Sequence, residues 1–244
     1  MARWITFTLL LLNLNLQAQS YYEMRTYTCH PDKRPDLIER FKNHTIKLFN
    51  KHGIKSVAYF IPADTVQNSL TFILQYPSEQ SRDILWNQFA NDPEWKAAAA
   101  KSEANGKLVA KVDQTFMTMA NELSTKVAKT KKKEKKIFEL RIYTCLPDRL
   151  DALTLRFRDH TRTLFERHGM QNIVYWKSLE KNGQQPKLIY LLAHKSEKTA
   201  KASFESFVAD ADWIKARDAS ETSGKIVQNI ESIYFKALPF SPLQ

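Results

Sequence analysis

The chain has 244 residues, which fits one or two domains, and its 43% of hydrophobic residues is ordinary for a globular protein. Its five glycines form no glycine-rich phosphate loop, which excludes a P-loop or a dinucleotide-binding fingerprint. Of the net charge of +11, residues 126–136 carry +6 and Arg3 carries +1, so only +4 is left for the rest of the chain.

Residues 1–18 have the layout of a secretory signal peptide. Arg3 gives a positive start, residues 5–12 form an unbroken run without charge, and no charge follows up to Ala18. We therefore expect cleavage near Ala18 and export, to the periplasm or the medium. The alternative is a retained membrane anchor, although the run is short for a membrane span.

The rest of the chain consists of two sequence repeats of one module. Residues 23–32 and 139–148 are identical at seven of ten positions, at an offset of 116. Residues 41–53 and 157–169 hold the same offset, with seven of thirteen positions identical. Two like domains are therefore expected. The predicted organisation is a first repeat at 21–120, a Lys-rich linker at 121–136 and a second repeat at 137–244.

The first repeat has the pattern β-α-β-β-α-β. Residues 21–29 alternate in polarity as a strand does, and an apolar stripe at helical spacing runs from about Asp32 to His52, where Gly53 ends the helix. Ser78 and Asp92 are suitable N-caps for two further helices. The remaining strands are expected at 55–61, 70–76 and 108–117.

The second repeat has the same order, with a longer hairpin that carries the tight-turn pair Asn182-Gly183. Its strands are expected at 137–145, 172–178, 187–193 and 226–236, and its helices at 148–168 and 196–222. This order is that of a ferredoxin-like domain, whose four-stranded antiparallel sheet is bare on one face. The predicted fold is therefore α+β, with two ferredoxin-like repeats whose sheets pack face to face into a barrel with helices outside.

These motifs resemble the NIPSNAP family, within the dimeric α/β-barrel superfamily. The resemblance is carried by EMRTYT and ELRIYT, by H-T-x-x-L-F-x-x-H-G in both repeats, by the segment at 89–112 and by the closing FSPLQ. It implies the tandem ferredoxin-like fold and an intramolecular dimeric α/β barrel, but little chemistry. Eukaryotic members are mitochondrial proteins linked to trafficking and mitophagy signalling. That role is not carried over, because this chain has an export signal and a Lys-rich linker.

Polar side chains repeated in both copies are the candidate site residues. Glu23, Arg25 and Tyr27 share one strand face, and a histidine of the following helix is expected above them. Such a set suits an acid–base or ligand pocket, since superfamily relatives place small ligands or haem between helix and sheet. The alternative is structural: the Glu–Arg pairs fix the strands, and each histidine bonds a backbone carbonyl. The candidates are Glu23, Arg25, Tyr27, His44, His52, Glu139, Arg141, Tyr143, His160 and His168, with His44 and His160 as catalytic candidates.

No cofactor is required by the sequence, and no metal site is expected. The two cysteines, Cys29 and Cys145, have no Cys/His cluster beside them; they either form a disulfide, which export would permit, or remain half-buried thiols. The lysine run predicts a solvated connector, or else contact with an anionic surface or a protein partner. Nucleic-acid binding would need basic residues interleaved with aromatic ones on one surface, and these are absent.

Two functions remain open at this point. The first is an exported, non-catalytic module that binds a small hydrophobic ligand or another protein. The second is a cofactor-independent oxygenase- or isomerase-like enzyme that acts on a small hydrophobic molecule. A cavity between helix and sheet with His44 or His160 pointing in favours the enzyme, whereas a space filled by Phe41, Leu48 and Trp86 favours the module. Whether the internal dimer pairs with a further copy is left open.

Overall fold

The computed structural model describes residues 20–64, 66–130, 135–179 and 184–244. The predicted signal peptide and the Asn182-Gly183 turn lie outside these ranges. Within them, no helix is long and apolar enough to cross a membrane.

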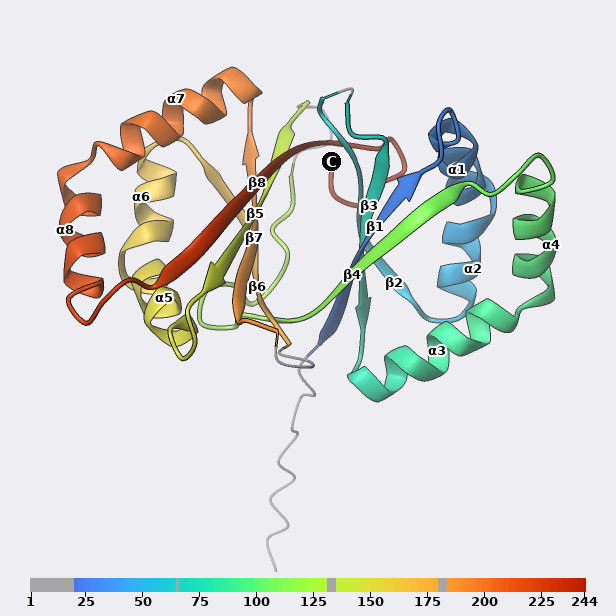
Figure 1. The fold of residues 1–244 in the computed structure, drawn as a ribbon, viewed down its shortest axis with the longest axis horizontal. Coiled ribbons are helices and arrows are strands. Elements are labelled where there is room, and N and C mark those ends of the chain that lie inside the picture. The colour runs from blue at the N-terminus through green and yellow to red at the C-terminus, as the bar shows by residue number, and fades with distance from the viewer. Residues whose placement is uncertain (1–19, 65, 131–134, 180–183) are drawn as a thin grey trace, which may run out of the picture.

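Both repeats contain the predicted elements in the predicted order (Figure 1). The first repeat comprises β1 (Tyr21–Cys29), α1 (Arg34–Arg40), the π-helix η1 (Phe41–Thr45), α2 (Ile46–Lys51), β2 (Lys55–Pro62), β3 (Ser69–Tyr76), α3 (Glu79–Asn91), α4 (Pro93–Ser102) and β4 (Val109–Met119). The second comprises β5 (Ile137–Cys145), α5 (Leu150–Arg156), the π-helix η2 (Phe157–Thr161), α6 (Arg162–Arg167), β6 (Gln171–Ser178), β7 (Lys187–His194), α7 (Glu197–Val208), α8 (Ala211–Ser220) and β8 (Val227–Ala237).

The strands form one closed antiparallel barrel in the order β1-β3-β2-β8-β5-β7-β6-β4. Each repeat supplies four neighbouring strands. The repeats meet where β2 pairs with β8 and where β4 pairs with β6, each through three residues of either strand. Figure 1 shows the strands in the middle and the helices of each repeat on opposite flanks. The predicted fold, an α+β barrel made of two ferredoxin-like repeats, is confirmed.

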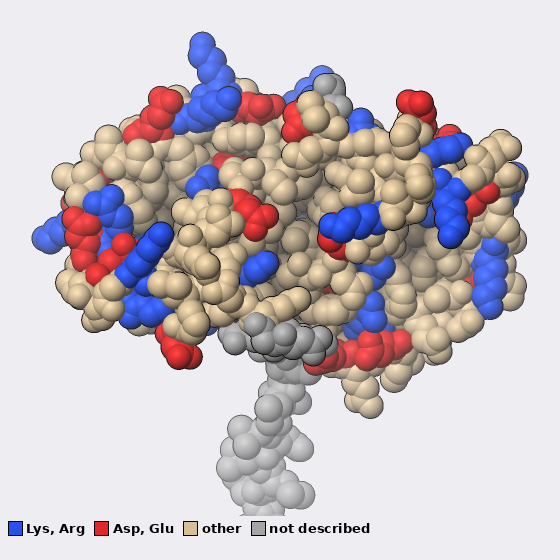
Figure 2. All heavy atoms as spheres, in the orientation of Figure 1, with Lys and Arg blue, Asp and Glu red and all other residues tan. Residues whose placement is uncertain are grey.

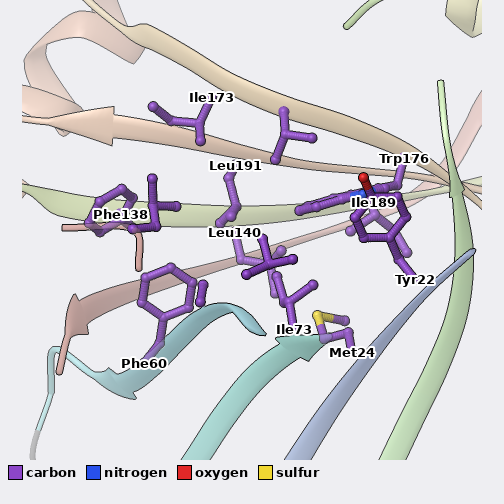
Figure 3. Close-up of a cluster of buried hydrophobic side chains, with 14 of the residues drawn as sticks. Tyr22, Met24, Phe60, Ile73, Phe138, Leu140, Ile173, Trp176, Ile189 and Leu191 are labelled. Carbon is purple, nitrogen blue, oxygen red and sulfur yellow. The ribbon is translucent and has the colours of Figure 1, made fainter. Parts of the chain in front are cut away.

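Inward side chains of both sheets fill the barrel with one apolar cluster (Figure 3). Aromatic contacts cross between the repeats, and two of them are equivalent: Tyr22 lies 5.7 Å from Trp176, and Phe60 lies 5.2 Å from Phe138, measured between ring centroids. Burial of this cluster removes the bare face of each sheet from water, which is the main force that holds the repeats together.

The space between each sheet and its helices is filled as well. In the first repeat, Phe41 and Leu48 are buried, and Phe41 lies 5.0 Å from Phe72 of β3, measured between ring centroids. Trp86 lies 6.0 Å from Phe49 in the same cluster. Ring contacts of similar length join Phe157, Phe165 and Tyr190 in the second repeat.

The prediction of one long helix from about Asp32 to His52 is wrong in two respects. Asp32 belongs to the turn, with φ of 60°, and the helix begins at Arg34. It is then interrupted by the π-helix η1, where the Thr45 hydroxyl donates to the carbonyl of Arg40, five residues back, at 3.3 Å. Thr161 repeats the bond to Arg156 at 3.2 Å. The buried threonine therefore stabilises the wider turn in both copies.

The linker lies against one end of the barrel. Just before it, the amide of Ala120 donates to the carbonyl of Tyr175 at 3.0 Å, and within it the amide of Ala128 donates to the carbonyl of Ile173 at 2.9 Å. Val127 packs on the barrel cluster. Lys126 and Lys129 are exposed, as expected of a connector, but the backbone between them is docked.

Candidate functional site

The predicted Glu–Arg pair of the first repeat is formed, on the helix side of β1. Glu23 is 0% exposed, and its Oε1 accepts a hydrogen bond of 2.6 Å from Arg25 Nη1. Arg82 of α3 donates from Nε and Nη2 to the two carboxylate oxygens, each at 3.0 Å. The Tyr76 hydroxyl donates to Oε2 at 3.2 Å. The carboxylate accepts four hydrogen bonds, which is its full capacity.

Aromatic rings shield both guanidinium groups of this network. Arg25 lies 4.4 Å from the ring centre of Trp86 and 5.4 Å from that of Tyr27, and Arg82 lies 5.2 Å from Trp86. Burial opposes the charged form, but the hydrogen bonds and charge of Glu23 hold the pKa of Arg82 above its usual value. Charge and rings together explain how two cations and one anion lie in an apolar layer.

The second repeat has a related but different network. Glu139 is also 0% exposed and accepts from Arg141 Nη1 at 2.7 Å, from the Ser232 hydroxyl at 2.6 Å and from His194 Nε2 at 2.9 Å. Arg141 donates to the Tyr143 hydroxyl at 3.2 Å. Burial opposes ionisation of Glu139, yet the bonds from His194 and Ser232 and the charge of Arg141 hold the pKa of Glu139 below its usual range.

The two networks differ in the second residue that donates to the carboxylate. Because the second hairpin is longer, positions after it correspond at an offset of 118, which places Ala200 opposite Arg82 and His194 opposite Tyr76. A helix arginine in one copy is thus replaced by a strand histidine in the other. Sequence reasoning missed Arg82 and His194, although aligning the two copies displays both differences.

These contacts restrict what the carboxylates can do chemically. A general base needs a free lone pair that faces a substrate. Glu23 has none left, and Glu139, which is itself 0% exposed, is held by three donors. The arrangement suits a network that fixes strands and helices.

His52 and His168 join helices instead of entering a pocket. His52 Nε2 lies 2.7 Å from Asp92 Oδ2, and His168 Nε2 lies 2.7 Å from Asp210 Oδ2. Each aspartate also caps the following helix through its other oxygen, at 2.8 Å. Their partners are carboxylates and, for His168, a hydroxyl of Ser206, so the expected bond to a backbone carbonyl is not the one formed.

The catalytic candidates His44 and His160 lie on the outer surface of the π-helices. Both side chains are exposed. Neither is brought together with the Glu–Arg networks, which lie in the buried layer beneath. The structure therefore divides the ten candidates into two buried networks, two helix-joining histidines and two surface histidines.

Both cysteines are free thiols and buried. Burial raises the pKa of the Cys29 thiol above its usual value and raises that of Cys145 to about 11. Such thiols are poor nucleophiles at neutral pH. Among the residues that the structure describes, no group of three or more His, Cys, Asp or Glu side chains could hold a metal ion.

A cavity of about 920 Å³ lies at the barrel end that the linker crosses. Its wall combines the starts of β1 and β2, the ends of β3 and β4, linker residues 125–130 and the carboxyl-terminal segment. Tyr22, Val57, Met119 and Leu243 connect it with the apolar cluster of the barrel. Its volume is in the range of small-molecule sites. Sequence reasoning missed it, because it depends on where the linker docks.

Solved structures with the same fold include two bacterial monooxygenase-like proteins. One, from Lactobacillus acidophilus NCFM, has a TM-score of 0.59 at 6% identity, over 90% of this chain and 94% of its own. The other, from Fusobacterium nucleatum, has a TM-score of 0.55 at 10% identity, over 93% and 99%. A NIPSNAP domain protein from Burkholderia xenovorans aligns over 39% of this chain and 90% of its own, at 19% identity and a TM-score of 0.35. No curated protein matches the chain.

The sequence pattern of the NIPSNAP family matches residues 22–122 and again residues 138–242. The two matches correspond to the two halves of the barrel and together cover most of the chain. The resemblance inferred from the repeated motifs is thereby confirmed: the chain belongs to the NIPSNAP family.

Proposed function

We propose that the chain is an exported, non-catalytic module that binds a small, largely apolar ligand in the cavity at the linker end of the barrel. The observation that carries the proposal is the cavity itself. It holds about 920 Å³ and opens onto the apolar cluster of the barrel. Concave sites of this size with mixed apolar and polar walls are the usual small-ligand sites of proteins.

The state of the repeated polar residues supports binding without catalysis. Glu23 and Glu139 are saturated or enclosed by their partners, and the rings of Phe41 and Trp86 fill the space where a helix–sheet ligand would lie. A group that is already fully hydrogen-bonded would have to break a buried ion pair to react, at a cost of several kcal/mol, roughly 3–5.

The alternative is an oxygenase- or isomerase-like enzyme acting on a small hydrophobic molecule. It is favoured by the two monooxygenase-like proteins that share the fold over nearly the whole chain. Likeness of fold at this identity says nothing about the reaction. The enzyme hypothesis predicts that a bound ligand is converted on incubation in air, whereas the binding hypothesis predicts that it is recovered unchanged.

The test is mass spectrometry of small molecules that co-purify with the chain from Gln19 onward, which keeps every described residue. The variant is Ala128→Trp, since Ala128 lines the cavity and a large ring there fills it. The control is Ala110→Trp, at an exposed position near the opposite end of β4. We expect a ligand with the unmodified chain and with Ala110→Trp, and its loss with Ala128→Trp. Equal retention by all three proteins would refute the cavity as the site.

Export is tested separately. Amino-terminal sequencing of the protein recovered from the periplasm or the medium should begin at or near Gln19. A protein that stays with the membrane and begins at Met1 would support the retained anchor.

A further inference from the structure

The cavity exists because the linker breaks the symmetry of the barrel end. On the second repeat, the amide of Ala128 donates to the carbonyl of Ile173, and Val127 covers the cluster beside it. The residue equivalent to Ile173 is Val57, and no described segment lies on it in the same way; Val57 lines the cavity instead. The linker thus covers the barrel end at Ile173, whereas at the equivalent position, Val57, it forms one wall of the cavity.

The rim of this space is positively charged. Lys55 comes from the start of β2, and Lys126 and Lys129 come from the linker, so the three cations reach the cavity from two segments. The described residues of the wall include no Asp or Glu. Within the described part of the chain, none of the three ammonium groups lies within 4.0 Å of a carboxylate oxygen. On the face shown in Figure 2, by contrast, the two signs of charge are interspersed.

The floor of the cavity is the apolar cluster of the barrel, and of the two equivalent aromatic pairs in that cluster only the one at the cavity carries polar side-chain atoms. Tyr22 lines the cavity and packs on Trp176 at 5.7 Å, whereas the symmetry-related pair, Phe138 and Phe60, has no polar side-chain atom (Figure 3). Trp176 is 0% exposed, and its Nε1 has no hydrogen-bond partner among the described residues. A buried donor without a partner is uncommon and unfavourable. The polar side of the barrel interior is therefore the side on which the cavity lies.

We propose that the cavity binds an amphipathic monocarboxylate. The carboxylate lies among Lys55, Lys126 and Lys129, and the hydrocarbon body lies on Tyr22, Val57 and Met119. Cations that no carboxylate among the described residues neutralises, at a partly enclosed rim, attract an anion more strongly than paired surface cations do. The apolar floor adds affinity in proportion to the hydrocarbon area that it covers. This inference rests on the proposed function, because it assigns a ligand class to the same cavity.

The test is isothermal titration calorimetry with decanoate and with decan-1-ol as the uncharged analogue. We expect decanoate to bind at least about tenfold more tightly than decanol at low salt, with the difference shrinking as salt is added. The variant Lys55→Gln/Lys126→Gln/Lys129→Gln should lose roughly tenfold in affinity for decanoate and none for decanol. The control Lys42→Gln/Lys101→Gln/Lys201→Gln changes the net charge equally at exposed positions outside the cavity and should bind as the unmodified chain does.

Equal affinities for the two probes, or equal losses in the two triple variants, would overturn the ligand class. So would failure of decanoate to bind. The cavity as a binding site is judged by a different result: it is refuted if Ala128→Trp retains the same co-purified molecules as the unmodified chain. A neutral ligand lost on Ala128→Trp would therefore refute the monocarboxylate and leave the binding site in place.

Discussion

Glu23→Gln should destabilise the protein far more than an ordinary buried substitution. The change keeps the shape of the side chain but removes the buried anion that both Arg25 and Arg82 contact. Their side chains are 10% and 14% exposed, so water can screen the two guanidinium groups only weakly. Breaking a buried pair by removing one partner costs about 3–5 kcal/mol.

The assay is urea unfolding detected by circular dichroism, on the chain from Gln19 onward. Thermal unfolding is a second assay. For a chain of this length, 1 kcal/mol corresponds to about 2–4 °C in Tm, so the Tm of Glu23→Gln should be lower by roughly 6–20 °C. Glu139→Gln is the matched control and should cost less, about 1–3 kcal/mol, because only one arginine, Arg141, contacts the carboxylate there.

Removing the second cation should recover part of the loss. Glu23→Gln combined with Arg82→Ala copies the residue that the second repeat has at this place, Ala200. We expect the double variant to be more stable than Glu23→Gln alone by at least about 1 kcal/mol. A loss below about 1 kcal/mol for Glu23→Gln, or no recovery in the double variant, would refute the account of this network.

Three further predictions rest on the same contacts. The pKa of Glu139 is lower in the folded chain than in the unfolded one, where it is about 4.3. The stability that the ionised Glu139 contributes is therefore present above the unfolded pKa and is lost as the pH falls through the folded pKa. The difference in unfolding free energy between the unmodified chain and Glu139→Gln should narrow below about pH 4, and a difference that widens there would contradict the prediction. Thr45→Val should cost about 0.5–1.5 kcal/mol in urea unfolding through loss of the bond to Arg40, with a similar cost for Thr161→Val; no cost at either site would show that the π-helices do not depend on the hydroxyl. Cys29 and Cys145 should react with a thiol reagent only slowly at neutral pH until denaturant is added, whereupon two thiols react; rapid reaction of the folded protein would contradict their burial.

The fold could be predicted because the alternation within the strands, the repetition along the chain and the need to bury both sheets all indicate the same architecture. The alternation of residues 21–29 places Tyr22 and Met24 on one face and Glu23 and Arg25 on the other, and the structure keeps this division. Repetition at a fixed offset then requires a second sheet of the same kind, and two bare faces bury each other. The Glu–Arg pairing could be expected from the cost of burying a lone charge.

The rest of the site could not be reached in this way. Arg82 is 59 positions from Glu23, and strand alternation does not say which distant helix supplies a cation. His44 borders the apolar stripe of its helix, and a border position does not show whether a side chain turns toward the sheet or toward water; the structure buries the neighbouring Thr45 and exposes His44. The docked linker had only Val127, within a run of lysines, as its signal.

The most direct test of the proposed function is a crystal structure of the chain from Gln19 onward, grown with decanoate. The proposal predicts density for one decanoate in the cavity at the linker end of the barrel, with its carboxylate within hydrogen-bond distance of at least two of Lys55, Lys126 and Lys129. Density between helix and sheet beside Glu23 or Glu139, with the cavity at the barrel end empty, would contradict it.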